Sequence, residues 1–269
     1  MVSQIVRVNG AALHCQLDGP VDGPVLVFSN SLGTDFRVWD GVVADLAKDY
    51  RILRYDKRGH GLSDDPDDGW AMEALVGDLA ALLDHFGLTD VGVVGLSVGG
   101  LIAQGLAAER PDLVNAMVLA DTAARIGNDD MWNDRISQVQ SGGLASVADA
   151  ILVRWFAPDF LDDPNFPMWR NMLSRTSDQG YARVCAAIRD TDLLVSTARL
   201  TLPLLAIVGD KDGSTPPDMV RETAELVAGA RFEIIRNTGH LPCVEKPEIF
   251  TKLVREFLTD AGYSRAKTA

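Results

Sequence analysis

Apolar positions along the chain fall into short blocks separated by amphipathic stretches. Compact apolar runs of four or five residues recur, and each run is typical of a buried strand. These runs cover residues 25–28, 51–55, 91–94, 116–120, 204–208 and 232–235. Before them, residues 4–8 and 12–17 alternate weakly around Asn9-Gly10, a pair that favours the tight turn of a β-hairpin.

Between the strands the apolar spacing changes to that of a helix. From Met72 to Phe86 the apolar residues recur at i, i+3, i+4 and i+7, and Gly87 then ends the pattern. Helices are also expected over about 98–110, 217–228 and 249–258. Strands that alternate with helices predict a mostly parallel sheet covered by helices on both faces.

One long segment interrupts this alternation. Residues 122–194 contain no strand pattern and predict several helices separated by glycine and proline. A helical insertion between two strands of a parallel sheet lies at their carboxyl ends, over the crevice where such folds bind ligands. We therefore expect an α/β core formed by residues 1–121 and 195–262, a helical cap at 122–194 and a flexible tail at 263–269.

Composition narrows the class of protein but does not indicate its chemistry. Among 269 residues, 38 acidic and 25 basic side chains give a net charge of −13, which argues against partners such as nucleic acid or an anionic membrane. No signal peptide and no apolar run of the ~18–20 residues that span a membrane is present. Three dispersed cysteines favour reduced thiols, so we expect a cytoplasmic protein. Whether it forms a homo-oligomer stays open.

The segment Gly95-Leu96-Ser97-Val98-Gly99 matches the G-x-S-x-G pattern of a nucleophile elbow. It directly follows a predicted strand and directly precedes a predicted helix, which is the context that the motif requires. The sharp turn strains the serine backbone, excludes side chains from the flanking glycines and holds Oγ at the positive end of the helix. We therefore predict Ser97 as a catalytic nucleophile.

A serine nucleophile needs a histidine base, which a carboxylate orients. In this arrangement the acid and the histidine follow the serine along the chain, and among the four histidines only His240 comes after Ser97. The acid is expected after the strand at 204–208, where Asp210 and Asp212 are candidates. We favour Asp212, because Asp210 lies so close to the strand end that it is better suited to forming the turn.

Acyl transfer also requires two N–H donors for the developing oxyanion. The amide of Val98, next to the nucleophile, is one expected donor. The amide of Leu32, in the loop after the strand at 25–28, is the other. No histidine pair has the spacing of metal ligands, so neither a metal nor another cofactor is expected.

These motifs resemble the α/β-hydrolase superfamily over about residues 2–260. The resemblance rests on the elbow, the ordered triad, RYDKRGHGLS and NTGH, and it implies a mostly parallel eight-stranded sheet with an inserted helical cap. By this resemblance, Ser97, Asp212 and His240 match the family triad, and Leu32 and Val98 match its oxyanion positions.

Three further segments, FSNSLGTDFRVWD, DTAARIG and GYARVCAAIRDTDL, look most like 3-oxoadipate enol-lactonases. Those enzymes open β-ketoadipate enol-lactone in the protocatechuate branch of aromatic catabolism. The chain departs from their GLSMGG pattern at Val98, where methionine is expected; this leaves the backbone amide available and alters the packing of the pocket. The resemblance therefore implies the same lactone hydrolysis here.

The implied substrate is a small lactone that carries a carboxylate. A protein of charge −13 needs a local cation to hold this anion, and arginine suits a carboxylate better than lysine does. The predicted cap has seven arginines and no lysine, and Trp132 and Arg135 are the candidate substrate-binding residues. Ten aspartates share the same segment, so most of its arginines are expected to form surface ion pairs.

Other activities on this scaffold stay open. A carboxylesterase or a meta-cleavage C–C bond hydrolase would share the triad and differ in cap and pocket, and a haloperoxidase-like perhydrolase is a further alternative. A non-catalytic ligand receptor could also keep the triad, and it would show at most one slow burst per molecule. A haloalkane dehalogenase is excluded, because it requires aspartate in place of Ser97.

Overall fold

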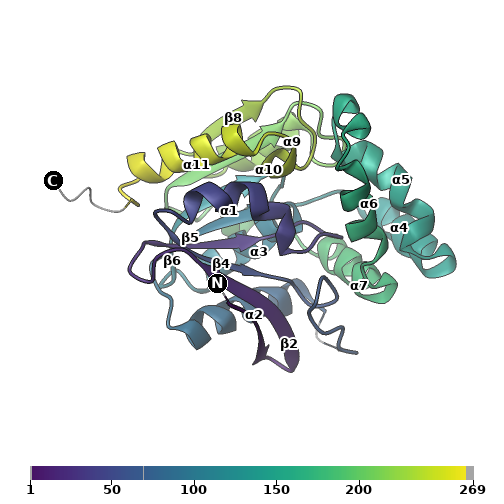
Figure 1. Ribbon diagram of the computed structural model, residues 1–269, viewed down its shortest axis with the longest axis horizontal. Helices are drawn as coiled ribbons and strands as arrows, with labels where there is room; N and C mark the ends of the chain where they lie inside the picture. The colour runs from purple at the N-terminus through teal and green to yellow at the C-terminus, as the bar shows by residue number, and fades with distance from the viewer. Residues whose placement is uncertain (1, 69, 265–269) are drawn as a thin grey trace.

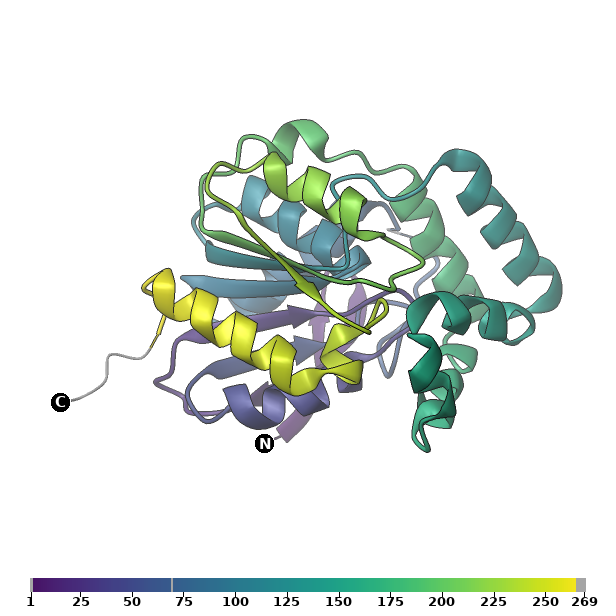
Figure 2. The same ribbon diagram turned by 90° about the horizontal axis from the view of Figure 1, so that it is seen from above.

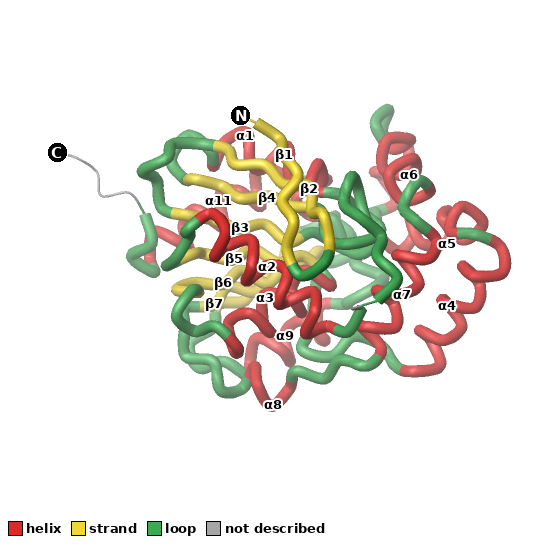
Figure 3. The backbone as a smooth tube through the Cα atoms, turned by 90° about the horizontal axis from the view of Figure 1, so that it is seen from below, coloured by secondary structure: helices red, strands yellow, loops and turns green. Residues whose placement is uncertain are grey.

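The computed structural model describes residues 2–68 and 70–264, and within these ranges the chain forms an eight-stranded sheet. The strand order is β1-β2-β4-β3-β5-β6-β7-β8, as the tube drawing in Figure 3 shows for most of the sheet. β2 pairs antiparallel with β1 and β4, and the other pairings are parallel. The mostly parallel sheet predicted from the sequence is thus confirmed. In chain order the strands are β1 (Val2–Val8), β2 (Ala11–Asp18), β3 (Val25–Ser29), β4 (Arg51–Tyr55), β5 (Val91–Leu96), β6 (Val114–Ala120), β7 (Leu204–Gly209) and β8 (Arg231–Ile235).

Helices cover both faces of this sheet (Figures 1 and 2). On one face α1 (Asp40–Leu46) packs against α11 (Pro247–Asp260), which follows the short helix α10 (Pro242–Glu245). On the other face α2 (Met72–Phe86) packs against α3 (Val98–Glu109), and α9 (Pro217–Glu225) lies against β7. The two-sided cover follows from the strand–helix alternation of the sequence.

The apolar pattern located α2 but missed the helices that follow β3. The apolar face of α2 is buried, and Gly87 ends the helix with a φ of 61°, a left-handed conformation that glycine adopts without strain. The 3₁₀ helix η1 (Phe36–Trp39) and α1 were not predicted, because each spans two turns or fewer and so offers too few positions for a helical period. Asp35 caps η1 by accepting a hydrogen bond from the amide of Arg37.

Between β6 and β7 the chain leaves the sheet and forms a group of helices at one end of it, drawn in teal and green in Figures 1 and 2. Trp155 and Gly180 of this cap lie against Gly239 and Gly59, in loops that follow β8 and β4. The cap therefore covers the carboxyl ends of the parallel strands, as expected for an insertion of this kind. Its elements are α4 (Asp129–Gly142), α5 (Leu144–Trp155), η2 (Pro158–Asp162), α6 (Phe166–Ser174) and α7 (Asp178–Arg189), and α8 (Leu194–Thr197) leads back to β7.

The flexible tail was predicted to begin at residue 263, which is one residue or more too early. Tyr263 is fixed, because its amide donates to the carbonyl of Leu258 at 2.7 Å and its hydroxyl donates to the carbonyl of Val25 at 2.6 Å. Gly262, with a φ of 72°, makes the left-handed turn that places Tyr263 there. Residues 265–269 of the predicted tail lie outside the described part of the chain.

Two further expectations from the sequence concern membrane-spanning helices and the state of the cysteines. None of the helices formed by residues 2–68 and 70–264 is both long enough and apolar enough to cross a membrane. The three cysteines are buried free thiols, as their sparse spacing predicted: Cys15, Cys185 and Cys243.

Candidate active site

Ser97 lies in a sharp turn between β5 and α3. Its φ of 56° and ψ of −119° form a strained conformation for a residue with a side chain. A Cβ atom at Gly95 would meet the carbonyl oxygen of Gly99 at 2.3 Å, and one at Gly99 would meet that of Ser29 at 2.0 Å. Both flanking positions therefore require glycine, which is the physical basis of the motif. The Thr122 hydroxyl donates to the Ser97 carbonyl at 2.7 Å and holds the turn.

The structure brings Asp212 rather than Asp210 to His240. Nδ1 of His240 lies 2.8 Å from Oδ2 of Asp212, and both side chains are buried. Asp212 also accepts from the amides of Ser214 and Thr215 at 2.7 and 3.1 Å, and from the Thr215 hydroxyl at 2.6 Å. Burial opposes ionisation of Asp212, but the charge and hydrogen bond of His240 lower the pKa of this carboxyl below its usual value. Asp212 is therefore an anion that orients the imidazole.

Ser97 and His240 line one cavity between the core and the cap. The cap side of this cavity includes the predicted residues Trp132 and Arg135, and the core side includes Leu32. The structure thus gathers at one place residues that lie far apart in the sequence. The cavity is lined by Ser31, Leu32, Ser97, Ile126, Met131, Trp132, Arg135, Ile151, Arg154, Trp155, Tyr181, Ser214, Thr215 and His240.

Both predicted oxyanion donors lie close to Ser97: Val98 follows it in the chain, and Leu32 lines the same cavity. Leu32 lines the cavity, and Val98 is the first residue of α3, where a helix has no internal partner for its N–H groups. Across residues 2–68 and 70–264, neither amide donates a hydrogen bond to a protein acceptor. Both N–H groups are therefore available to a ligand.

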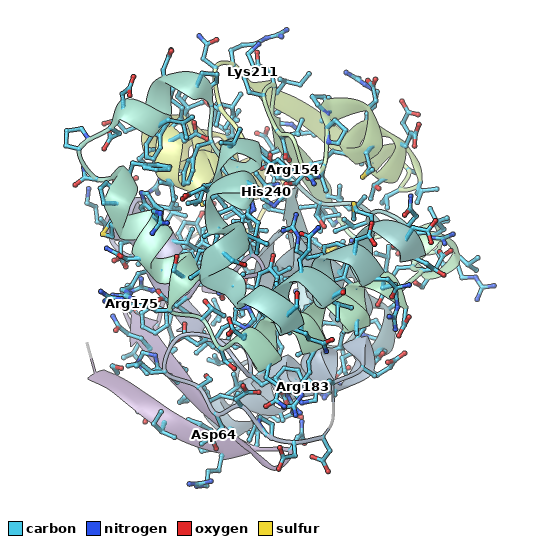
Figure 4. The ribbon with its side chains drawn as sticks, turned by 90° about the vertical axis from the view of Figure 1, so that its right-hand side faces the viewer. Asp64, Arg154, Arg175, Arg183, Lys211 and His240 are labelled. Carbon is cyan, nitrogen blue, oxygen red and sulfur yellow. The ribbon has the colours of Figure 1, made fainter. Side chains whose placement is uncertain are left out.

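Arg135 and Arg154 bring two guanidinium groups to the cavity. Arg135 donates to the Tyr181 hydroxyl at 3.3 Å, and Arg154 donates to the Gly213 carbonyl at 2.9 Å. Within the described residues neither guanidinium has a carboxylate partner. Figure 4 labels Arg154 and His240, which both line this cavity. The sequence analysis had named Arg135 but had not distinguished Arg154 from the other cap arginines, because only the fold shows which of them reach the cavity. Four of the others form ion pairs with aspartates, as expected: Arg125, Arg170, Arg183 and Arg189.

Trp132 contributes an apolar wall rather than a hydrogen-bond donor. Its Nε1–H is bound to the carbonyl of Ile126 at 2.7 Å, and the side chain is almost fully buried. The indole ring therefore faces the cavity with its donor already satisfied, which suits contact with a flat apolar part of a ligand.

A second buried carboxyl group, Asp121, lies beside Asp212 and was not predicted. Acceptor atoms of Asp121, Asp212 and His240 all lie within 4.8 Å of one another. Oδ1 of Asp121 accepts from the amide of Gly209 at 2.9 Å. Oδ2 is buried and receives no hydrogen bond from any donor among the described residues. Burial, followed by the charge of Asp212, raises the pKa of Asp121 well above its usual value. The signal in the sequence was a carboxyl group directly after the apolar run at 116–120, at the sheet end where the other site residues lie.

Comparison with known proteins defines the class of this protein. The profile of the alpha/beta hydrolase family matches residues 11–253, so the chain belongs to that family. Two relatives, 3-oxoadipate enol-lactonases 2 and 1 of Acinetobacter baylyi, are 34% and 33% identical over 93% and 94% of this chain, and the matches cover 94% and 96% of their own lengths.

Solved structures agree with this assignment. The enol-lactonase from Burkholderia xenovorans superposes with a TM-score of 0.92 at 38% identity, over 95% of this chain and 99% of that one. A thermophilic esterase from Thermogutta terrifontis superposes with a TM-score of 0.88 at 26% identity, over 97% of this chain and 98% of that one. By family, fold and relatives, the chain is a hydrolase.

Proposed function

We propose that this protein hydrolyses 3-oxoadipate enol-lactone (β-ketoadipate enol-lactone) to 3-oxoadipate, a step of aromatic catabolism. The observation that carries the proposal is the cavity itself, in which the nucleophile and base candidates share one space with Arg135 and Arg154. Hydrolysis of a lactone that bears a carboxylate needs a nucleophile and a base for the reaction, and it needs cations to bind the carboxylate. Similarity to enol-lactonases over more than nine-tenths of the chain supports this substrate class.

The chemistry follows from the roles of a Ser-His-Asp triad. His240 removes the hydroxyl proton of Ser97 as the Ser97 Oγ attacks the lactone carbonyl. The amides of Leu32 and Val98 bind the oxyanion that forms. The lactone C–O bond then breaks, and the enolate oxygen takes the proton from the imidazolium and leaves as an enol, which tautomerises to the ketone. Water activated by His240 hydrolyses the acyl-serine and releases the dicarboxylate. Throughout, Asp212 stabilises the imidazolium.

The cap supplies substrate recognition. A guanidinium can donate two parallel hydrogen bonds to one carboxylate. This role for Arg135 and Arg154 is supported by their position in the cavity lining and by the absence of a carboxylate partner for either among the described residues. Trp132 lies beside them with its N–H already bound, and its ring packs against the lactone ring. The substrate is thereby held with its carbonyl toward Ser97 and its carboxylate toward the cap.

Relative specificity tests this proposal. We would measure kcat/KM for 3-oxoadipate enol-lactone, a p-nitrophenyl ester and a meta-cleavage dienoate with the same preparation. A clear preference for the enol-lactone is expected. A preference of about tenfold or more for the ester or the dienoate would replace the proposal with a carboxylesterase, as the esterase likeness favours, or with a C–C bond hydrolase.

A further inference from the structure

A buried lysine contacts the loop that carries the first oxyanion donor. Lys57 lies in the turn after β4 and is only 2% exposed. Its Nζ donates to the carbonyl oxygen of Ser31 at 2.6 Å. The carbonyl of Ser31 and the N–H of Leu32 belong to the same planar peptide group. The ammonium is therefore bound to one end of the peptide whose other end is the proposed oxyanion donor.

We propose that Lys57 is a positioning residue that fixes and polarises the Ser31–Leu32 peptide, so that the Leu32 N–H binds the oxyanion more strongly. Hydrogen bonds in series polarise one another, and a charged donor forms the stronger kind of hydrogen bond. A cation on the carbonyl withdraws electron density from the amide nitrogen and leaves its hydrogen more positive. The inference rests on the proposed acyl transfer at Ser97.

The same turn also holds the next peptide of the loop. Nε2 of His60 accepts from the amide of Gly33 at 2.9 Å, and Nδ1 lies 3.1 Å from the carbonyl of Arg58. An Nε2 that accepts must be unprotonated. Burial, followed by the charge of Lys57, lowers the pKa of His60 and keeps the ring neutral. The turn at 57–60 thus fixes the peptide groups on both sides of Leu32.

The Ser31 carbonyl also accepts from the hydroxyl of Thr34 at 2.9 Å and from the amide of Thr34 at 3.3 Å. These neutral contacts already satisfy the carbonyl, so Lys57 is not required merely to pair a buried oxygen. Burial lowers the pKa of Lys57 to about 7, although Asp56 and Asp35 favour the charged form, so the ammonium form predominates below this pH. A buried ammonium opposes folding, and here it is bound to the carbonyl of the peptide that carries the proposed oxyanion donor.

The nearby anions have other partners. Asp35 is bound by the guanidinium of Arg37, with contacts at 2.6 and 2.9 Å. Asp56 accepts from His14 at 2.7 Å and from the amides of Phe36 and Leu62 at 2.8 and 3.0 Å. The hydrogen bond of Lys57 is directed at the Ser31 carbonyl instead.

Lys57→Met tests the inference, because methionine has a similar length but no donor and no charge. The control is Lys252→Met, which removes the same charge from the exposed surface of α11. The readouts, taken at about pH 6.5 where the Lys57 ammonium predominates, are kcat and KM for p-nitrophenyl acetate and the affinity for phenylboronic acid, which forms an anionic tetrahedral adduct with the nucleophilic serine. Lys57→Met should lower kcat and the boronic-acid affinity about tenfold, less than the 10²–10³ for a deleted oxyanion donor. KM should stay within about twofold of wild type.

Wild-type kcat and wild-type boronic-acid affinity in folded Lys57→Met would overturn the inference. If that variant shows no cooperative thermal transition, Lys57→Gln replaces it; its neutral amide keeps a donor without the charge and should also lose kcat and affinity together, whereas unchanged values would again overturn the inference. Ser97→Ala is measured in the same assay. An inactive Ser97→Ala with a normal Lys57→Met refutes the role of Lys57 alone, whereas an active Ser97→Ala refutes the proposed acyl transfer.

Discussion

Asp121 and Asp212 lie close to each other and to His240, with acceptor atoms of the three within 4.8 Å, and two adjacent buried carboxyl groups cannot both be ionised at neutral pH. Their hydrogen bonds show which one keeps the charge. Asp212 accepts from His240, from two amides and from a hydroxyl, whereas Asp121 accepts from the amide of Gly209. The proton therefore belongs to Asp121, whose remaining oxygen can donate to Asp212 and moderate its basicity.

Two substitutions at Asp121 separate this role from simple packing. Asp121→Asn keeps a donor toward Asp212, so the acid limb of the kcat/KM profile should stay in place. Asp121→Leu removes the donor, so Asp212 should hold the imidazolium more strongly and shift the acid limb to higher pH by roughly 0.5–1 unit. The measurement is kcat/KM from about pH 5 to 9. An equal shift to lower pH in both variants would show that Asp121 is ionised in the native protein, because each variant would then remove a negative charge that stabilises the imidazolium.

At the scale of elements, the end of α5 is joined to both loops that carry the candidate acid and base. The carbonyl of Arg154 accepts from the amide of Gly213 at 3.1 Å, and the carbonyl of Trp155 accepts from the amide of His240 at 2.7 Å. Glu245 of α10 adds a bridge, since its carboxyl accepts from the amides of Gly239 and Ala157 at 2.7 and 3.0 Å. The cap is thus hydrogen-bonded to the loops that carry the candidate acid and base.

Glu245 should make this junction sensitive to pH. Burial raises its pKa from 4.5 to about 7, so between these values the folded protein binds a proton that the unfolded chain has lost. The stability contributed by that proton is full below 4.5 and is lost as the pH rises through 7. Relative to Glu245→Gln, the wild-type free energy of unfolding should fall over this interval by about 1 kcal/mol, which allows for solvent screening of a partly exposed group.

Urea denaturation of both proteins at about pH 5 and 7.5 measures this difference. Glu248→Gln, on the exposed surface of α11, controls for the loss of one negative charge. A wild-type protein that gained stability over Glu245→Gln as the pH rose would reverse the expected sign and contradict the assignment.

Periodicity could predict the elements whose apolar pattern is long enough to have a period. The stripe of α2 and the buried strands are examples, and the elbow at Ser97 needed only its strand–turn–helix context. Helix α1 is too short for such a signal, and the strand order depends on pairings between distant residues. Which cap arginines reach the cavity depends on how α4 and α5 pack. Asp121 was missed because a carboxyl group after one strand is informative only when the neighbouring strand brings Asp212 beside it.

For the whole molecule, the net charge of −13 opposes the approach of an anionic substrate. Under the proposed function the local field of the cavity must overcome this charge, and we propose that Arg135 and Arg154, which line the cavity, supply that field. The remaining cap arginines that pair with aspartates add little net charge near the site. On this proposal, the two cavity arginines should matter strongly for an anionic substrate and little for a neutral ester.

Arg154→Met tests this balance. It should raise KM for 3-oxoadipate enol-lactone about tenfold or more, because a charge-assisted contact is worth roughly 1.5–3 kcal/mol, and it should leave KM for p-nitrophenyl acetate nearly unchanged. Arg170→Met is the matched control, since Arg170 pairs with Asp149 on the outside of the cap. Equal losses for the charged and the neutral substrate would mean that Arg154 acts through the packing of α5 and not through its charge.

The most direct test of the central claim is the turnover of 3-oxoadipate enol-lactone by wild-type protein and by Ser97→Ala under identical conditions. The wild-type protein should release 3-oxoadipate over many turnovers. Ser97→Ala should fold normally and lose about 10³-fold or more of kcat, because the attack that starts the reaction needs the serine oxygen. Lactone turnover by Ser97→Ala at a rate near wild type, or a single slow burst in the wild-type protein, would contradict the account.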